Sequence, residues 1–143
     1  MEENSIIFSN EKNDIVRINE LKVNNFRNYR YLNLAISDKQ IVLTGRNGSG
    51  KTNLIEAISL LTAGKGLRRA KREELKYKTI NDVNSENIKT EWSIFSKLSI
   101  NDNELTVGTS SQNSLNTNSR TIKIDGNKST QQDLSKIFSI SWL

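Results

Sequence analysis

Between positions 45 and 52 the chain reads Gly45-Arg46-Asn47-Gly48-Ser49-Gly50-Lys51-Thr52. This stretch satisfies the phosphate-binding pattern G-x-x-x-x-G-K-[ST] at every fixed position. Glycines let consecutive backbone N–H groups curl around an anion, the lysine reaches the β- and γ-phosphates, and the final hydroxyl ligates Mg²⁺. The sequence therefore predicts that residues 45–52 hold the phosphates of a nucleotide, with Thr52 as the Mg²⁺ ligand.

The segments on either side of this loop fit the same motif. Gln40-Ile41-Val42-Leu43-Thr44 is a short apolar run of the kind that forms a buried strand. Apolar residues then recur at helical spacing between positions 54 and 61. Strand, glycine loop and helix in this order predict an α/β fold of P-loop NTPase type, in which the positive end of the helix dipole faces the phosphates.

The composition excludes several classes of function. The chain has 143 residues, enough for one domain with a modest core, and contains neither cysteine nor histidine. Disulfides, Cys/His zinc sites and a histidine general base are therefore excluded. The acidic start has no signal-peptide pattern, and no apolar stretch approaches membrane-spanning length. We expect a soluble cytoplasmic protein without a membrane partner.

Positive charge is concentrated between positions 65 and 78. The net charge is +5, and most of the excess comes from Lys65, Arg68, Arg69, Lys71, Arg72, Lys76 and Lys78. Two interpretations stay open: a solvated loop and helix face, or a segment that contacts the phosphate backbone of DNA. We call residues 65–78 the basic segment.

The rest of the chain predicts a flexible N-terminus and an antiparallel β-subdomain. Residues 1–14 are polar and are expected to be flexible. Extended segments are predicted at 15–26, 29–36, 92–100, 105–107 and 122–124, a further one opens at 139–143, and helices are predicted near 72–77 and 131–138. Residues 81–90 are expected to form a polar linker and 108–119 a mobile loop or long hairpin end.

Three stretches carry a resemblance to a known family. They are Leu21-Lys22-Val23-Asn24-Asn25-Phe26-Arg27-Asn28-Tyr29, the loop with its continuation Asn53-Leu54-Ile55-Glu56-Ala57-Ile58, and Leu60-Leu61-Thr62-Ala63-Gly64-Lys65-Gly66-Leu67-Arg68-Arg69-Ala70. In order, they resemble the patterns L-x-x-x-N-F-R-N-Y, G-x-N-G-S-G-K-T-N-x-x-E-A-I and L-S-P-G-R-G-L-R-x-A of RecF proteins, the bacterial recombination and repair ATPases. Ala63 replaces the usual proline. The resemblance covers residues 15–143, and more loosely extends to SMC-like ATPase heads.

This resemblance implies lobe I of an ABC-type ATPase head that binds ATP and Mg²⁺ between two copies, giving an ATP-dependent homodimer of the full-length protein. It also implies DNA binding, on single-stranded or gapped DNA, in recombinational repair and the SOS response, with RecO and RecR as partners. Arg27 matches a basic residue near the nucleotide in the family. A hairpin surface charge is the alternative interpretation of Arg27.

Two family elements are not recognisable in the sequence: the Walker B acidic pair and the signature motif with its serine. Hydrolysis needs a carboxylate that orients water and a partner that completes the site. We therefore expect residues 15–143 to be an incomplete ATPase domain that binds ATP with little or no turnover. A small P-loop kinase or GTPase, and an inactive remnant of a RecF-like gene, are the alternatives.

Overall fold

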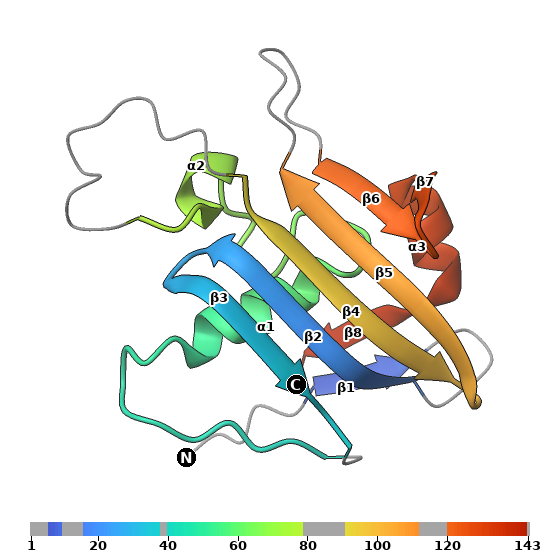
Figure 1. Ribbon diagram of the computed structural model, residues 1–143, viewed down its shortest axis with the longest axis horizontal. Coiled ribbons are helices and arrows are strands. Elements are labelled where there is room, and N and C mark those ends of the chain that lie inside the picture. Colours follow the sequence, from blue (N-terminus) through green and yellow to red (C-terminus); the bar gives the residue numbers. More distant parts are fainter. Residues whose placement is uncertain (1–5, 10–15, 38–39, 79–90, 112–119, 143) are drawn as a thin grey trace.

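The computed structural model describes residues 6–9, 16–37, 40–78, 91–111 and 120–142 (Figure 1). Its main element is a six-stranded antiparallel sheet with the strand order β3-β2-β4-β5-β6-β7. The strands are β2 (Val16–Phe26), β3 (Tyr29–Ala35), β4 (Ser93–Ile100), β5 (Asn103–Ser111), β6 (Arg120–Ile124) and β7 (Asn127–Ser129). Among the described residues, the helices α1 (Lys51–Ser59), α2 (Arg72–Leu75) and α3 (Gln131–Ile137) accompany the sheet, with α1 behind it in Figure 1.

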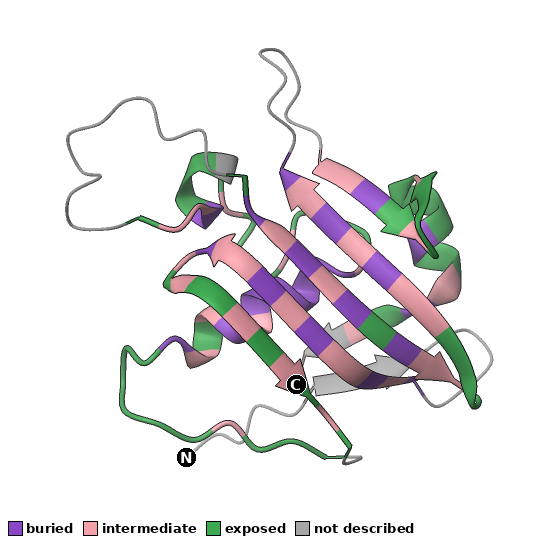
Figure 2. Ribbon diagram, in the orientation of Figure 1, coloured by how far each residue is buried: buried purple, intermediate pink, exposed green. Residues whose placement is uncertain are grey.

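The strands form because apolar residues alternate along them, so that one face of the sheet is buried and the other meets solvent. Figure 2 shows this alternation along β2, β4 and β5. In β2 the buried positions change from even to odd numbers between Ile18 and Leu21. A register shift between Ile18 and Glu20 accounts for the change, because the extra residue returns the next apolar side chains to the same face.

The core lies between the sheet and α1. Leu54, Ala57 and Ile58 on α1 are buried against the inner face of the sheet. Phe26 and Trp92 meet there edge to face, with ring centroids 5.8 Å apart and an interplanar angle of 77°. This packing fixes the direction of α1, and thereby of the loop that precedes it.

The first and last described strands form a separate two-stranded sheet. β1 (Ile6–Ser9) pairs antiparallel with β8 (Ser139–Trp142). The strand predicted to open at residue 139 is therefore present. Of residues 1–14, expected to be flexible, the structure describes only residues 6–9. Their pairing partner lies at the far end of the sequence, beyond the reach of a local pattern.

Two predictions were wrong. The apolar run at residues 40–44 forms no strand: Ile41 is 53 % exposed and Val42 is 83 % exposed. A strand needs a neighbour to accept its backbone hydrogen bonds, and no described strand lies beside this run. Residues 108–111, expected to be loop, belong to β5, because pairing with β4 and β6 outweighs their polar composition. The predicted linker at 81–90 and the loop at 112–119 lie outside the described residues.

Candidate functional site

The glycine loop adopts a conformation that only glycine accepts readily. Gly48 has φ = 80° and Gly50 has φ = 100°, both in the left-handed region. Gly50 is also crowded, since a Cβ atom there would lie 2.4 Å from Nδ2 of Asn28 and 2.9 Å from the hydroxyl oxygen of Tyr29. The second fixed glycine of the motif is therefore required for its backbone geometry and for the close approach of the first hairpin.

α1 begins at the end of this loop, as the motif predicts. Gly50 is its N-cap and has no side chain to cap the first turn, and the first turn carries no acidic residue. The regular helical bonding starts with the N–H of Leu54, which donates to the carbonyl of Gly50 at 3.0 Å. The first N–H groups of the helix are thus available to an external acceptor, which is the arrangement that binds phosphate.

The Lys51 ammonium lies back over the loop. Its Nζ donates to the carbonyl oxygen of Gly45 at 2.5 Å and to that of Arg46 at 2.9 Å. The loop is closed by the N–H of Ser49, which donates to the Arg46 carbonyl at 3.1 Å. The side chains of Arg46, Asn47 and Thr52 are exposed, so the hydroxyl of Thr52 is open to solvent beside Lys51. The Lys51 ammonium therefore contacts the loop directly, and the exposed Thr52 follows it in the first turn of α1.

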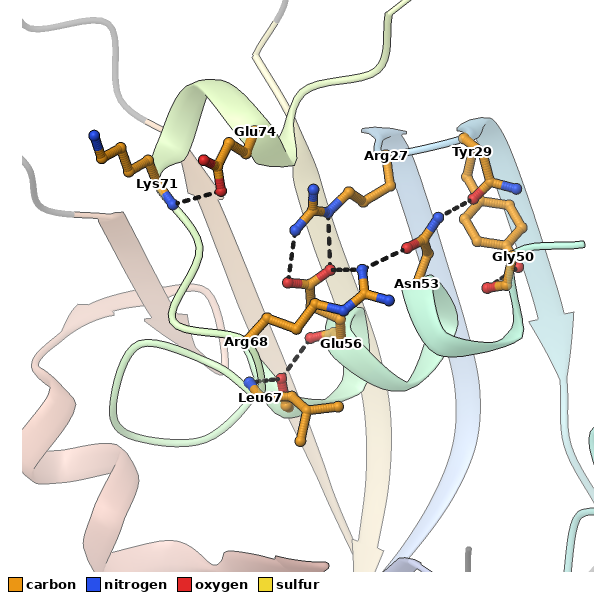
Figure 3. Close-up of polar contacts among 11 residues, drawn as sticks. Arg27, Tyr29, Gly50, Asn53, Glu56, Leu67, Arg68, Lys71 and Glu74 are labelled. Carbon is orange, nitrogen blue, oxygen red and sulfur yellow. Dashed lines mark hydrogen bonds and ion pairs between the residues drawn. The ribbon is translucent and has the colours of Figure 1, made fainter. Parts of the chain in front are cut away.

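The hairpin between β2 and β3 supports the loop from the side (Figure 3). The hydroxyl of Tyr29 donates to the Gly50 carbonyl at 3.0 Å. The amide nitrogen of Asn53 donates to Oδ1 of Asn28 at 2.8 Å. Burial raises the pKa of Tyr29, so the phenol stays a neutral donor. The first hairpin thus holds the loop and the first turn of α1 in place.

Arg27 does not reach the loop itself in this structure. Its guanidinium donates to both carboxylate oxygens of Glu56 on α1, at 2.8 and 2.9 Å (Figure 3). Glu56 is 1 % exposed and also pairs with Arg68 of the basic segment at 3.5 Å. Arg68 in turn donates to Oδ1 of Asn53 at 3.1 Å. A chain of polar contacts therefore connects the loop helix, the first hairpin and the basic segment.

Sequence reasoning missed Glu56. The signal was present, because a carboxylate sits among the apolar positions of the helix that follows the loop. A buried carboxylate requires a cationic partner, and a fork-shaped guanidinium is the partner that satisfies both oxygens. Looking for that partner would have pointed to Arg27 or Arg68 before the structure was known.

A second arginine contacts α1 at its other end. Arg120, at the start of β6, donates to the carbonyls of Leu60 and Thr62 and, at 3.2 Å, to that of Gly64. The pKa of Arg120 is lowered to about 10 by burial. Gln131 of α3 accepts from the N–H of Gly64 at 2.9 Å. No local sequence signal indicates this contact, since the arginine lies far along the chain from the helix end.

The basic segment runs from the end of α1 back to the first hairpin. The N–H of Arg27 donates to the Leu75 carbonyl at 2.8 Å, and that of Tyr77 donates to the Asn25 carbonyl at 2.7 Å. Among its described side chains, the exposed cations are Lys65, Arg68, Arg69, Lys71 and Lys78. The N–H of Leu67 donates to Oγ of Ser59 on α1 at 2.8 Å. The segment is therefore hydrogen-bonded to α1 near its start and to the first hairpin near its end.

A metal centre built from acidic side chains is not found in the described residues. They contain no cluster of three or more Asp or Glu residues arranged to hold a metal ion. No helix in the described part of the chain combines the length and the apolar character needed to span a lipid bilayer.

A glycine loop that leads into a helix, with a lysine and a hydroxyl at its mouth, defines the class of P-loop nucleotide-binding proteins. The model of the RecF/RecN/SMC N-terminal domain matches residues 17–143. The chain belongs to this family.

Curated relatives narrow the relationship to RecF. The chain is 36 % identical over 129 residues to the DNA replication and repair protein RecF of Rhizobium etli (strain CIAT 652), covering 90 % of this chain and 32 % of that protein. It is 58 % identical over 62 residues to RecF of Brucella abortus (strain 2308), covering 43 % of this chain and 16 % of that protein. The chain spans about a third of the length of the first of these relatives.

Solved structures agree with this assignment. A structure of the recombination mediator protein RecF-ATPrS in the RecFOR pathway superposes with a TM-score of 0.68 and 25 % identity, covering 85 % of this chain and 30 % of that one. The SMC head domain from Thermotoga maritima shares the fold with a TM-score of 0.60 and 22 % identity, covering 82 % of this chain and 40 % of that one. The fold is therefore that of part of a RecF- or SMC-type ATPase head, as the sequence predicts.

Proposed function

We propose that this chain is the nucleotide-binding part of a RecF-type DNA repair ATPase, and that it binds Mg-ATP at residues 45–52. The observation that carries the proposal is the loop itself, with Lys51 over its carbonyls and the open helix end beside it. In this proposal the backbone from Gly45 to Lys51 and the Lys51 ammonium hold the phosphates. The Thr52 hydroxyl supplies one ligand to Mg²⁺.

Arg27 belongs to the proposed site through α1. Its bidentate bond to Glu56 positions the helix whose first turn receives the phosphates. Direct contact between Arg27 and a nucleotide would have to compete with that pair. We therefore propose that Arg27 positions the loop helix, and that it contacts ATP only when the Glu56 carboxylate releases it.

The proposed partner is DNA, bound through phosphates rather than read by base sequence. The exposed cations of the basic segment lie on a stretch that is tied to α1 through Glu56. This arrangement suits contact with a phosphate backbone. The same proposal includes RecO- and RecR-type partners, ATP-dependent dimerisation, cytoplasmic location and a role in the SOS response, and membership of the family supports it.

Slow or absent hydrolysis is also proposed. Catalysis of phosphoryl transfer needs a group that orients the attacking water and cations that complete the site. The sequence shows neither a Walker B strand nor a signature motif. Binding without steady turnover is the expected behaviour of this chain.

The test is a titration of the full chain with a fluorescent ATP analogue in the presence of Mg²⁺. Lys51→Ala should abolish saturable binding, because the cation over the loop is removed. Lys65→Ala, an exposed lysine outside the loop, is the matched control and should leave the affinity unchanged. Equal affinities for wild type and Lys51→Ala would refute the site. Competition by GTP as strong as that by ATP would favour the kinase or GTPase alternative.

A further inference from the structure

The outer face of the six-stranded sheet, opposite the core, carries a row of side chains that the nucleotide site does not use. The antiparallel register aligns one residue from each strand across its full width: Asn33, Lys22, Phe95, Gly108, Lys123 and Lys128. We call these six residues the outer row. Neighbouring strands lie about 4.8 Å apart, so the row extends for roughly 24 Å. In Figure 1 this face is turned to the viewer, with α1 on the far side.

The outer row has an unbalanced positive charge. Lys123 and Lys128 are exposed and directly opposite each other on β6 and β7. Like charges in this arrangement destabilise a sheet. Neither forms an ion pair with another described residue, whereas Glu20 on the same face is already shared by Lys22 at 2.9 Å and Lys97 at 3.5 Å. An anion bound across the row would relieve the repulsion that the fold leaves in place.

A half-buried aromatic ring lies in the same row. Phe95 on β4 is half-buried, and the Lys22 ammonium is 5.6 Å from the centroid of its ring. On the other side, its cross-strand neighbour is Gly108, which has no side chain to cover the ring. Tyr31 on the edge strand β3 is 63 % exposed on the same face. Aromatic faces of this kind stack unpaired bases.

We propose that the outer row binds single-stranded DNA, with phosphates on Lys123 and Lys128 and a base stacked on Phe95. Cations interleaved with an aromatic ring on a flat sheet suit a strand whose bases are free to stack, whereas a duplex presents no free base face. The choice of DNA over another polyanion rests on the proposed function. The site is separate from the basic segment, which lies beside α1.

The test measures the affinity of the full chain for labelled oligothymidylate by fluorescence anisotropy at several salt concentrations. Lys123→Glu and Lys128→Glu should each weaken binding about threefold to tenfold and lower the slope of log affinity against log salt by about 0.7 for each phosphate that is no longer neutralised. Phe95→Leu, which keeps an apolar side chain, should weaken binding at least about fivefold and leave the salt slope unchanged. Lys136→Glu, an exposed lysine on α3, is the matched control.

The outcomes separate this inference from the proposed function. The outer-row site is overturned if the variants Lys123→Glu, Lys128→Glu and Phe95→Leu all keep wild-type affinity for DNA. If affinity is then lost only in an Arg68→Glu/Arg69→Glu variant, the basic segment is the DNA contact. Equal weakening of single-stranded and duplex DNA by Phe95→Leu overturns the stacking. Absence of any DNA binding by the wild-type chain overturns both DNA assignments, while the ATP titration with Lys51→Ala still decides the nucleotide site.

Discussion

The segments before and after the phosphate loop have similar apolar content in the sequence, but only the segment after the loop forms a regular element with buried side chains. After the loop, α1 forms and buries Leu54, Ala57 and Ile58. Before it, Ile41 and Val42 remain exposed in a segment without strand geometry. A helix satisfies its backbone hydrogen bonds within itself, whereas a strand depends on neighbours that the local sequence does not contain. Apolar residues at helical spacing therefore predict a helix from the local sequence alone, whereas a short apolar run predicts a strand only where a neighbouring strand can pair with it.

The largest expected effect on the helix side comes from removing Glu56. Glu56→Ala should lower the free energy of unfolding by about 3 kcal/mol, because it leaves the partly buried guanidinium of Arg27 without its carboxylate partner, while the exposed Arg68 returns to water. Urea unfolding followed by circular dichroism measures the change. Glu73→Ala, exposed on α2, should change stability by less than about 0.5 kcal/mol. Similar free energies of unfolding for Glu56→Ala and Glu73→Ala would contradict a stabilising role of the Arg27–Glu56 pair.

Gly50 lies between the two segments. Gly50→Ala should lower the free energy of unfolding by about 1–3 kcal/mol, because it adds backbone strain at φ = 100° and a clash with Asn28 and Tyr29. The same change should abolish nucleotide binding. Gly64→Ala separates the two causes. Gly64 has φ = 102°, but a Cβ atom there would have nothing within 4 Å. Urea unfolding measures both variants. If Gly64→Ala lowers the free energy of unfolding as much as Gly50→Ala does, the close approach of the hairpin contributes nothing to the effect at Gly50.

The third prediction concerns Thr130 and Asp133, which form the cap at the start of α3. The Thr130 hydrogen bonds, and then the charge of Lys136, hold the pKa of Asp133 below its ordinary value. A carboxyl whose pKa is lower in the folded state stabilises the fold above its unfolded pKa, near 3.8, and this contribution is lost as the pH falls through the lower folded value. An NMR titration should show the depressed pKa in wild type, and a value closer to normal in Thr130→Ala. An ordinary pKa of Asp133 in the wild-type chain would contradict the hydrogen bonds between Thr130 and Asp133 that cap α3.

The smallest effect is expected on the strand side. Val42→Ser should change the free energy of unfolding by less than about 0.5 kcal/mol, because the side chain is 83 % exposed. The same substitution at Val23, which is fully buried in β2, should be strongly destabilising. Thermal unfolding of the two variants makes the comparison. A large loss at Val42 would mean that residues 40–44 do bury their side chains.

The sequence predicted the elements that depend on local patterns. The loop, the helix from Lys51 and the first hairpin all follow from glycine placement and hydrophobic periodicity. It could not predict the pairing of β1 with β8 or the contact of Arg120 with the end of α1, because both join residues far apart in the chain. In the site, Lys51 and Thr52 were predictable from chemistry at fixed spacing, whereas the role of Arg27 depends on a tertiary partner, Glu56.

The bonds that Arg120 makes at the carboxyl end of α1 also affect the electrostatics of the opposite end. The guanidinium offsets the partial negative charge of the last carbonyls, while no acidic side chain offsets the partial positive charge of the first turn. The helix is therefore electrically neutralised at one terminus alone. The partial positive charge at the amino terminus acts without a balancing field from the carboxyl terminus. A bound anion would supply the missing counter-charge at the amino terminus.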